Sequence, residues 1–401
     1  MKYIMHSSMS FFQDMNIIKA ENNKGNNIGA LVYQYSLANT LLGKNDDIEF
    51  ANILRMINND INKAAEYVNQ YNCLILGIGD ILRSDMIEKG VIENITNFLK
   101  NIKIRVLVVG IGCRRRYWDS VDEFLNKKNT RNIITEFIKE CLKHCNIIGI
   151  RGFDTANILK QLGFKEDIDF YIMGCPSMFM YGNKLAIKSI PEISNETTFA
   201  LNKNFNNVYL EYPENNKFFE ANIKKYNNRF AVFNSWLYEA VNIHYKDVKY
   251  KMKFIDLTID DYYRYNFTAC IDVPTYLNEL SKYDYCIGER MHGTAAAIMA
   301  GVPSVLISVD WRMEELALYH KIPYIRMNKT YEGLTFEEII KYADFTEMFK
   351  VHEENFKRYQ TFFHINSLKT IFDEADIDIE NTPFLTRVRK YNNSKIYKAK
   401  E

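Results

Sequence analysis

Two reactive side chains stand close together late in the chain, after an apolar run that ends at a glycine. Arg290 and His292 follow Gly288, and Gly293-Thr294 then opens a stretch of small residues. Arginine offers a planar fork of donors that suits a phosphate or carboxylate, and histidine acts as acid or base near neutral pH. A helix beginning at Gly293-Thr294 would add free backbone N–H groups at its positive end. The pattern predicts a site for an anionic substrate.

Charged residues also follow two other predicted strands. Arg151 ends one strand and precedes a helix start, and Asp310-Trp311-Arg312 follows the strand predicted over Ser304–Ser308. Ligands bind beyond the carboxyl ends of strands in open α/β sheets. Arg151 and Arg290 would hold one ligand from opposite walls if two domains faced each other. The alternative is that these side chains are solvated or paired locally, as Arg290 would be with Glu289.

Two glycine-containing loops and one arginine run are weaker signals. The loop at 25–29 includes Asn27 and Gly29 and would cradle a phosphate or approach a sugar, although such loops are also common turns. Asp80, after Gly77-Ile78-Gly79, would orient an acceptor hydroxyl or cap a helix. We expect Arg114–Arg116 to form a solvated face.

Apolar runs alternate with helical patterns along the chain, which predicts an α/β fold with parallel sheets. The strands are expected at 73–76, 104–109, 146–150 and 169–173 and, in a second series, at 207–212, 229–234, 253–255, 304–308 and 322–327. We expect an N-terminal domain over 1–180, a linker over 181–203, a C-terminal domain over 204–345, a helix over 346–379 that crosses back, and a flexible basic tail over 380–401.

Composition restricts the class of protein. The 401 residues include 51 basic and 50 acidic side chains, for a net charge of +1, which argues against a nucleic-acid binder. No apolar run has membrane-spanning length, and seven irregularly spaced cysteines fit a reducing compartment. We therefore expect a cytoplasmic protein with at most peripheral membrane contact through its tail. No metal site is expected, because metal-ligand spacing is lacking among His144, His244, His320, His352 and His364.

The motifs taken together resemble the polysaccharide pyruvyl transferase family over about residues 20–330. The motifs that carry the resemblance are Asn27-Ile28-Gly29, Arg151-Gly152-Phe153-Asp154, Gly174-Cys175-Pro176, Arg290-Met291-His292-Gly293, Gly301-Val302-Pro303 and Asp310-Trp311-Arg312. The resemblance implies a GT-B-like pair of Rossmann-like domains that face each other across a cleft. It also implies phosphoenolpyruvate as co-substrate and no cofactor. The pyruvyl group would move onto two hydroxyls of a sugar in a surface-glycan precursor, forming a ketal and releasing phosphate.

The resemblance also implies roles for individual residues. Arg290 and Arg151 would hold the donor's phosphate and carboxylate beside Gly293-Thr294, and His292 would protonate the donor methylene or assist phosphate departure. The acceptor, a sugar or oligosaccharide with or without a lipid carrier, would meet the residues of the acceptor side: Asn27, Gly29, Asp80, Asp310 and Arg312. The oligomeric state is left open. Two alternatives remain at this point: a GT-B glycosyltransferase that uses a nucleotide sugar, and a glycan-binding protein without activity.

Overall fold

A computed structural model describes most of the chain. The described residues are 1–13, 27–190, 192–203, 221–226, 229–233, 266–327, 334–391 and 396–398. The strands expected at 207–212 and 253–255, and the first part of the loop at 25–29, lie outside them.

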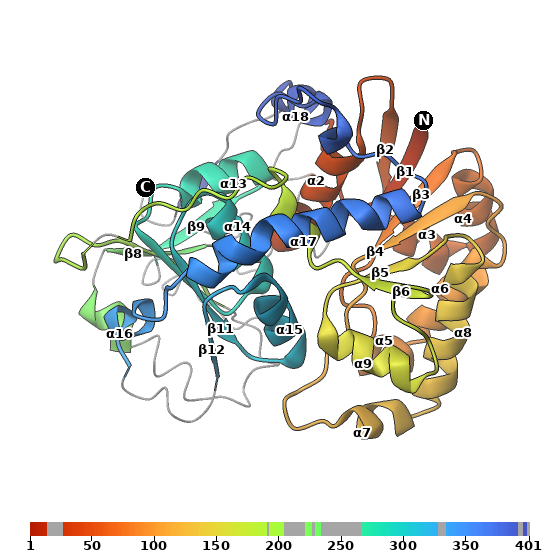
Figure 1. Cartoon of the computed structure of the whole chain (residues 1–401), viewed down its shortest axis with the longest axis horizontal. Coiled ribbons are helices and arrows are strands. Elements are labelled where there is room, and N and C mark those ends of the chain that lie inside the picture. The colour runs from red at the N-terminus through yellow and green to blue at the C-terminus, as the bar shows by residue number, and fades with distance from the viewer. Residues whose placement is uncertain are drawn as a thin grey trace, which may run out of the picture.

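The N-terminal half is built on parallel strands with helices around them (Figure 1). Four strands pair in the order β2-β1-β3-β4, and β5 and β6 pair separately beside them. A single bridge between Ile111 and Ile150 connects β5 to the edge at β4. The strands are β1 (Lys2–His6), β2 (Asp47–Ala51), β3 (Cys73–Gly77), β4 (Arg105–Val109), β5 (Ile148–Ile150) and β6 (Phe170–Ile172).

The N-terminal helices connect these strands. They are α2 (Ile28–Leu41), α3 (Ile53–Asn59), α4 (Ile61–Val68), α5 (Ser84–Glu88), α6 (Val91–Leu99), α7 (Val121–Asn126), α8 (Thr130–Leu142), α9 (Phe153–Gln161) and the 3-10 turn η1 (Pro176–Phe179). Side chains fix several helix starts. Asp60 accepts from two backbone N–H groups at the start of α4, and Ser120 and Glu123 form a capping box at the start of α7.

The C-terminal half contains a seven-stranded sheet in the order β12-β11-β10-β7-β8-β9-β13. Its strands are β7 (Phe199–Asn202), β8 (Phe230–Phe233), β9 (Phe267–Cys270), β10 (Tyr285–Gly288), β11 (Ser304–Ser308), β12 (Tyr324–Arg326) and the antiparallel β13 (Ile396–Lys398). Its helices are α13 (Val273–Leu280), α14 (Met291–Met299), α15 (Trp311–His320) and α16 (Phe336–Ile340). The expected α/β fold with two Rossmann-like domains is confirmed by the two sheets.

Two segments differ from the sequence-based expectation. The expected linker over 181–203 ends in β7, which lies in the middle of the C-terminal sheet between β10 and β8. Four residues are too few to show a period, although all of them are buried. The expected tail over 380–401 is also structured in part. Pro383–Arg389 form α18, whose Phe384 is buried, and β13 pairs with β9.

Each sheet reverses its strand order at one point, and such reversals mark binding crevices in open α/β sheets. In the N-terminal sheet the reversal lies between β1 and β3, because the chain adds β2 on one side of this pair and β4 on the other. In the C-terminal sheet it lies between β7 and β10. The residues that follow β3 and β10 are therefore the first place to look for a site.

Two helices tie the halves together. Helix α2 is buried along almost its whole length and packs against α14 of the other half. Helix α17 (Thr346–Ile365) runs across both halves in Figure 1. At its end, Asn366 contacts the N-terminal domain: its Nδ2 donates to Ile147 O at 3.1 Å, and its Oδ1 accepts from Asn146 N at 3.0 Å. The 3-10 turn η4 (Ile371–Asp373) follows. Among the described helices, none combines the length and the apolar character that a membrane span requires.

Candidate functional site

A cavity of about 190 Å³ lies where the two halves meet, at the reversal point of the N-terminal sheet. His6 at the end of β1 and Asp80 after β3 contribute to its wall, and Tyr33 comes from α2. Arg151, which follows β5, and His292, in the first turn of α14, complete the set of residues with reactive or aromatic side chains. The cavity therefore joins residues from both domains.

Arg151 and His292 face each other within this cavity. Arg151 Nη2 lies 3.4 Å from His292 Nε2. Because a guanidinium group only donates hydrogen bonds, His292 Nε2 is the acceptor and carries no proton. The Arg151 guanidinium lies over the ring of Tyr33 at 5.3 Å, and the Tyr33 hydroxyl donates to Val109 O at 2.9 Å. Arg151 is only 2% exposed, and its Nε has no hydrogen-bond partner among the described residues.

Two glycines make room for Arg151 and for His292. A Cβ at Gly79 would lie 1.9 Å from Arg151 Nη2, and a Cβ at Gly29 would lie 2.7 Å from His292 Cβ. Both separations are far below van der Waals contact, so a larger residue would displace the neighbouring side chain. The loops that contain these glycines thus approach the two charge-bearing side chains closely, which explains why the sequence has glycine there.

Asp80 is surrounded by arginines. Its Oδ2 lies 3.3 Å from Arg83 Nη1 and 3.6 Å from Arg312 Nη1. Burial would raise the pKa of Asp80, but Arg312, Arg83, Arg151 and Arg114 outweigh it and hold the pKa well below the ordinary value. These four guanidinium groups outnumber the three carboxylates that pair with them, Asp80, Asp85 and Asp310, which leaves a net positive charge that attracts an anion.

His292 is neutral in this environment. Burial lowers its pKa well below 6.5, and the positive charges of Arg151 and Arg312 lower it further, while Asp80 opposes them. An anion bound at Arg151 would cancel part of this effect, because it would neutralise the guanidinium and compete for its hydrogen bond. The pKa of His292 is thus coupled to occupancy of the cavity.

The other expected site residues make contacts that support the fold. Asn27 caps α2 by accepting from Gly29 N at 2.8 Å. Gly293 packs against Asn202, and Thr294 is fully buried next to Gly288. Arg290 occupies the N-cap position of α14 and is not among the residues that line the cavity. The expected pairing of Arg151 with Arg290 on one ligand therefore stays a prediction.

Asp310 caps a helix rather than lining the cavity. Its Oδ1 accepts from Met313 N at 2.9 Å at the start of α15, and its Oδ2 lies 3.5 Å from Arg114 Nε. The second ion pair of Asp310, to Arg312 Nη2 at 3.6 Å, extends the charged network to Asp80. The expectation that Arg114–Arg116 form a solvated face is wrong for Arg115, which is buried and pairs with Asp154.

Comparison with known families connects this geometry to an enzyme class. The sequence model described as "Polysaccharide pyruvyl transferase" matches residues 27–310. The chain belongs to the polysaccharide pyruvyl transferase family. The match spans the cavity residues from Tyr33 to His292 and both motifs that hold Arg151 and His292. A search of curated proteins found no match.

Solved structures with similar folds are distant in sequence from this chain. The UDP-GlcNAc 2-epimerase of Methanocaldococcus jannaschii, in complex with UDP-GlcNAc and UDP, is 11% identical, with a TM-score of 0.46 over 89% of this chain and 97% of that chain. The S. aureus MnaA–UDP structure is 11% identical, with a TM-score of 0.45 over 91% and 95%. Anabaena Alr3699/HepE, in complex with UDP and glucose, is 7% identical, with a TM-score of 0.42 over 91% and 97%.

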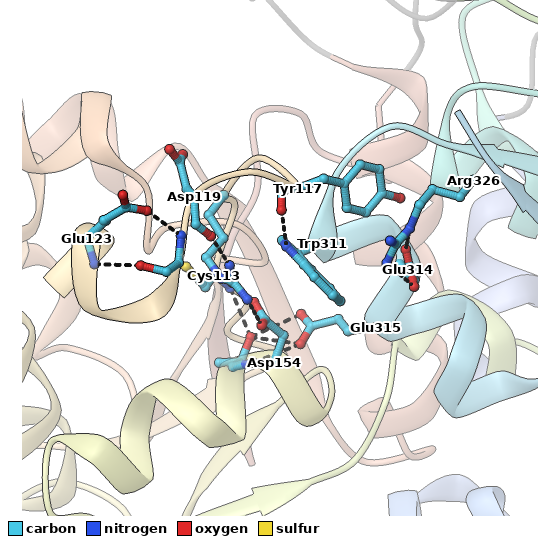
Figure 2. A network of polar contacts seen from close by, with 12 residues as sticks. Cys113, Tyr117, Asp119, Glu123, Asp154, Trp311, Glu314, Glu315 and Arg326 are labelled. Atoms are coloured by element: carbon cyan, nitrogen blue, oxygen red, sulfur yellow. Dashed lines mark hydrogen bonds and ion pairs between the residues drawn. The ribbon is translucent and has the colours of Figure 1, made fainter. Parts of the chain in front are cut away.

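A polar network beside the site joins the two domains of the pyruvyl transferase (Figure 2). Glu315 of α15 lies against the start of α9, where Thr155 N donates to its Oε2 at 2.9 Å and Thr155 Oγ1 lies 3.0 Å from its Oε1. The N-cap residue of α9 is Gly152, which has no side chain to cap the helix. Glu315 therefore supplies, from the other domain, the acceptor that α9 lacks. Trp311 adds a further contact by donating from its indole N–H to Tyr117 O at 3.4 Å.

The carboxyl group of Glu315 favours its protonated form. The side chain is 2% exposed, and burial raises its pKa to about 8, against the lowering effect of the Thr155 backbone N–H. A protonated carboxyl group can donate to Thr155 Oγ1 while its other oxygen accepts from Thr155 N. Because the folded pKa lies above the unfolded one, this contribution is present at low pH and is lost as pH rises through about 8.

We expect Glu315→Gln to flatten the pH dependence of stability. Glutamine reproduces the protonated carboxyl group, with an oxygen for Thr155 N and an amide N–H for Thr155 Oγ1, but does not titrate. Urea unfolding of both proteins at pH 6 and pH 9 checks this. From pH 6 to pH 9, the free energy of unfolding of the wild type should fall by roughly 1 to 3 kcal/mol more than that of the variant. This is the cost of an unfavourable buried polar group. Equal pH dependence in the two proteins would show that Glu315 does not titrate in this range.

Sequence reasoning missed three residues at or beside the site. His6 and Gln34 line the cavity, and Glu315 belongs to the polar network beside it. His6 ends the apolar run of β1, and a polar residue at the carboxyl end of a strand is the signal that was available. Gln34 and Glu315 lie within helices whose patterns gave no reason to single them out. The described residues contain no group of three or more His, Cys, Asp and Glu that could hold a metal ion.

Proposed function

We propose that this protein transfers the pyruvyl group of phosphoenolpyruvate onto two hydroxyls of a sugar in a surface-glycan precursor, and forms a cyclic ketal. The family membership supports a pyruvyl transferase, and the cavity supports an anionic donor. We further propose that the reaction takes place in the cytoplasm, with no cofactor, and that the acceptor is a sugar or oligosaccharide, free or carried by a lipid.

The observation that carries the proposal is the buried pair of Arg151 and His292. Arg151 is almost fully removed from solvent, keeps an Nε donor without a partner among the described residues, and shares its cavity with one carboxylate. A buried guanidinium is costly unless an anion pairs with it. Phosphoenolpyruvate supplies two anionic groups on one small molecule, which fits a positively charged cavity of about 190 Å³.

His292 is suited to protonate the donor's methylene carbon once the donor is bound. Its Nε2 accepts from Arg151 and carries no proton. When the donor's anionic groups bind Arg151, the guanidinium no longer donates to His292. The pKa of His292 then rises, so that the imidazole takes up a proton. Protonation of the methylene carbon then makes the neighbouring carbon electrophilic, and a sugar hydroxyl attacks it. Binding of the donor thus generates the acid that the reaction needs.

Transfer of label from ¹³C-labelled phosphoenolpyruvate tests the proposed activity. The protein is incubated with the labelled donor and a panel of 4-nitrophenyl glycosides that carry neighbouring free hydroxyls. NMR should show a new quaternary ketal carbon bonded to a methyl group, together with released phosphate. Turnover of a UDP-, GDP- or CMP-sugar with no use of phosphoenolpyruvate would contradict the proposal and favour a nucleotide-sugar glycosyltransferase.

A further inference from the structure

His6 is a second imidazole in the same cavity and has no role in the mechanism given above. It ends β1 at the reversal point of the N-terminal sheet and lines the cavity with Arg151 and His292. The residue is 9% exposed, and its Nδ1 has no hydrogen-bond partner among the described residues. Buried polar atoms are nearly always paired, so an imidazole with an unpaired buried nitrogen in a residue that lines a cavity is unusual and marks His6 as a candidate for a role in the site.

The surroundings of His6 suit a sugar rather than an anion. Gln34, 6% exposed, also lines the cavity, and its Oε1 lies 2.7 Å from Ser7 Oγ, which leaves the amide nitrogen as the group available to a ligand. Leu54 and Met86 add apolar surface to the same wall. A few placed polar groups on an otherwise apolar wall are what hydroxyl recognition requires.

The proton balance of the proposed transfer requires a second group besides His292. Phosphoenolpyruvate and two hydroxyls give a ketal and hydrogen phosphate, so two hydroxyl protons are lost. One ends on the methyl carbon and one on the phosphate. The first hydroxyl must release its proton while His292 is donating its own, and one imidazole cannot do both at the same moment.

We propose that His6 is a further catalytic residue, the base that accepts the proton of the first acceptor hydroxyl. This inference rests on the proposed function. In the first step a carbon–hydrogen bond forms at the methylene carbon with the proton of His292. The hydroxyl oxygen bonds to the adjacent carbon, and the hydroxyl proton moves to His6. In the second step the bond from that carbon to the phosphate oxygen breaks. The second hydroxyl attacks and returns a proton to His292, and the proton held by His6 reaches the departing phosphate through water.

His6 is in the correct state for this role. Burial lowers its pKa to about 4, so the imidazole is neutral at physiological pH. It is a weak base there, and it takes the hydroxyl proton only as that hydroxyl becomes acidic by bonding to the electrophilic carbon. His6 ends β1 and His292 lies in the first turn of α14, so different elements hold the base and the acid. We assign the acceptor side of the cavity to His6 and Gln34, in addition to Asp80.

The test compares wild type, His6→Asn and His6→Gln, because either variant keeps a polar atom without an imidazole. His352→Asn is the matched control: His352 is also buried with a nitrogen that has no partner among the described residues, but it packs against Phe179 outside the cavity. Two quantities are measured for each protein. One is the rise in melting temperature with phosphoenolpyruvate, and the other is phosphate release with the 4-nitrophenyl glycosides and with water alone.

We expect the His6 variants to keep the melting-temperature rise and to lose about 100-fold or more in phosphate release, the usual contribution of a general base. The control should retain both. Phosphate release within threefold of wild type, or loss of the melting-temperature rise, would overturn the role of His6 and leave the proposed function standing. A wild-type protein that binds phosphoenolpyruvate but releases no phosphate, even to water, would also overturn the role of His6. A wild type that shows neither effect would overturn the proposed function itself.

Discussion

Arg151→Lys is expected to weaken phosphoenolpyruvate binding by about 100-fold while the protein stays folded. Lysine keeps the positive charge but replaces a planar fork of donors with a single ammonium group. Each hydrogen bond to a charged group contributes about 1.5 to 3 kcal/mol, and loss of one or two of them gives a weakening of this order. Calorimetric titration of both proteins with phosphoenolpyruvate measures the difference.

Arg358→Lys is the matched control for this prediction. The Arg358 guanidinium also lies over a tyrosine ring, that of Tyr171 at 4.6 Å, but it is not among the residues that line the cavity. The control should bind phosphoenolpyruvate as the wild type does. If Arg151→Lys bound the donor equally well, the buried guanidinium would not be its ligand, and the anion would have to bind elsewhere.

His292→Asn is expected to lower pyruvyl transfer by 10²- to 10⁴-fold, the range typical of a positioned acid or base. Asparagine does not reach the position of Nε2, but the Arg151 guanidinium still lies over the Tyr33 ring and should keep its position. The effect should therefore appear in kcat, with the dissociation constant for phosphoenolpyruvate changed only a few-fold. Steady-state kinetics and a binding titration on the same protein separate the two.

His144→Asn serves as the control, because His144 is also partly buried but lies beside Glu140 and is not among the residues that line the cavity. Its transfer rate should equal that of the wild type. A His292→Asn protein with near wild-type kcat would show that His292 neither protonates the donor nor assists the departing phosphate. The proton would then have to come from another residue or from water.

Much of the fold could be predicted from the sequence because its parallel strands are short apolar runs bounded by glycine. The run Ser304–Ser308 is β11 at the expected bounds. Helix α14 follows β10 as expected, but it begins at Met291 rather than at Gly293-Thr294, and the Thr294 N–H donates to Arg290 O within the helix. Strand β7 was missed because four residues show no periodicity, and β13 because its pairing with β9 is a contact distant in sequence. Such contacts are decided by packing rather than by local pattern.

The candidate site could be predicted in part for the same reasons. Arg151 and His292 follow strands in the sequence, so their convergence could be expected from the topology of parallel sheets. Arg290 was expected beside them, but it precedes the first turn of α14 in an extended conformation, whereas His292 lies within that turn. Of the two, only His292 is among the residues that line the cavity. His6 and Glu315 became visible only through burial and contacts between domains.

Proton uptake on donor binding tests the central claim most directly. Titration calorimetry of the wild type with phosphoenolpyruvate near pH 7.5, in two buffers of different ionisation enthalpy, counts the protons bound. We predict binding with uptake of up to one proton by the wild type and none by His292→Asn, because the donor raises the pKa of His292. Affinity should accordingly fall as pH rises through the pKa of His292 in the complex. Binding without proton uptake, or binding of UDP-N-acetylglucosamine in place of phosphoenolpyruvate, would contradict the account.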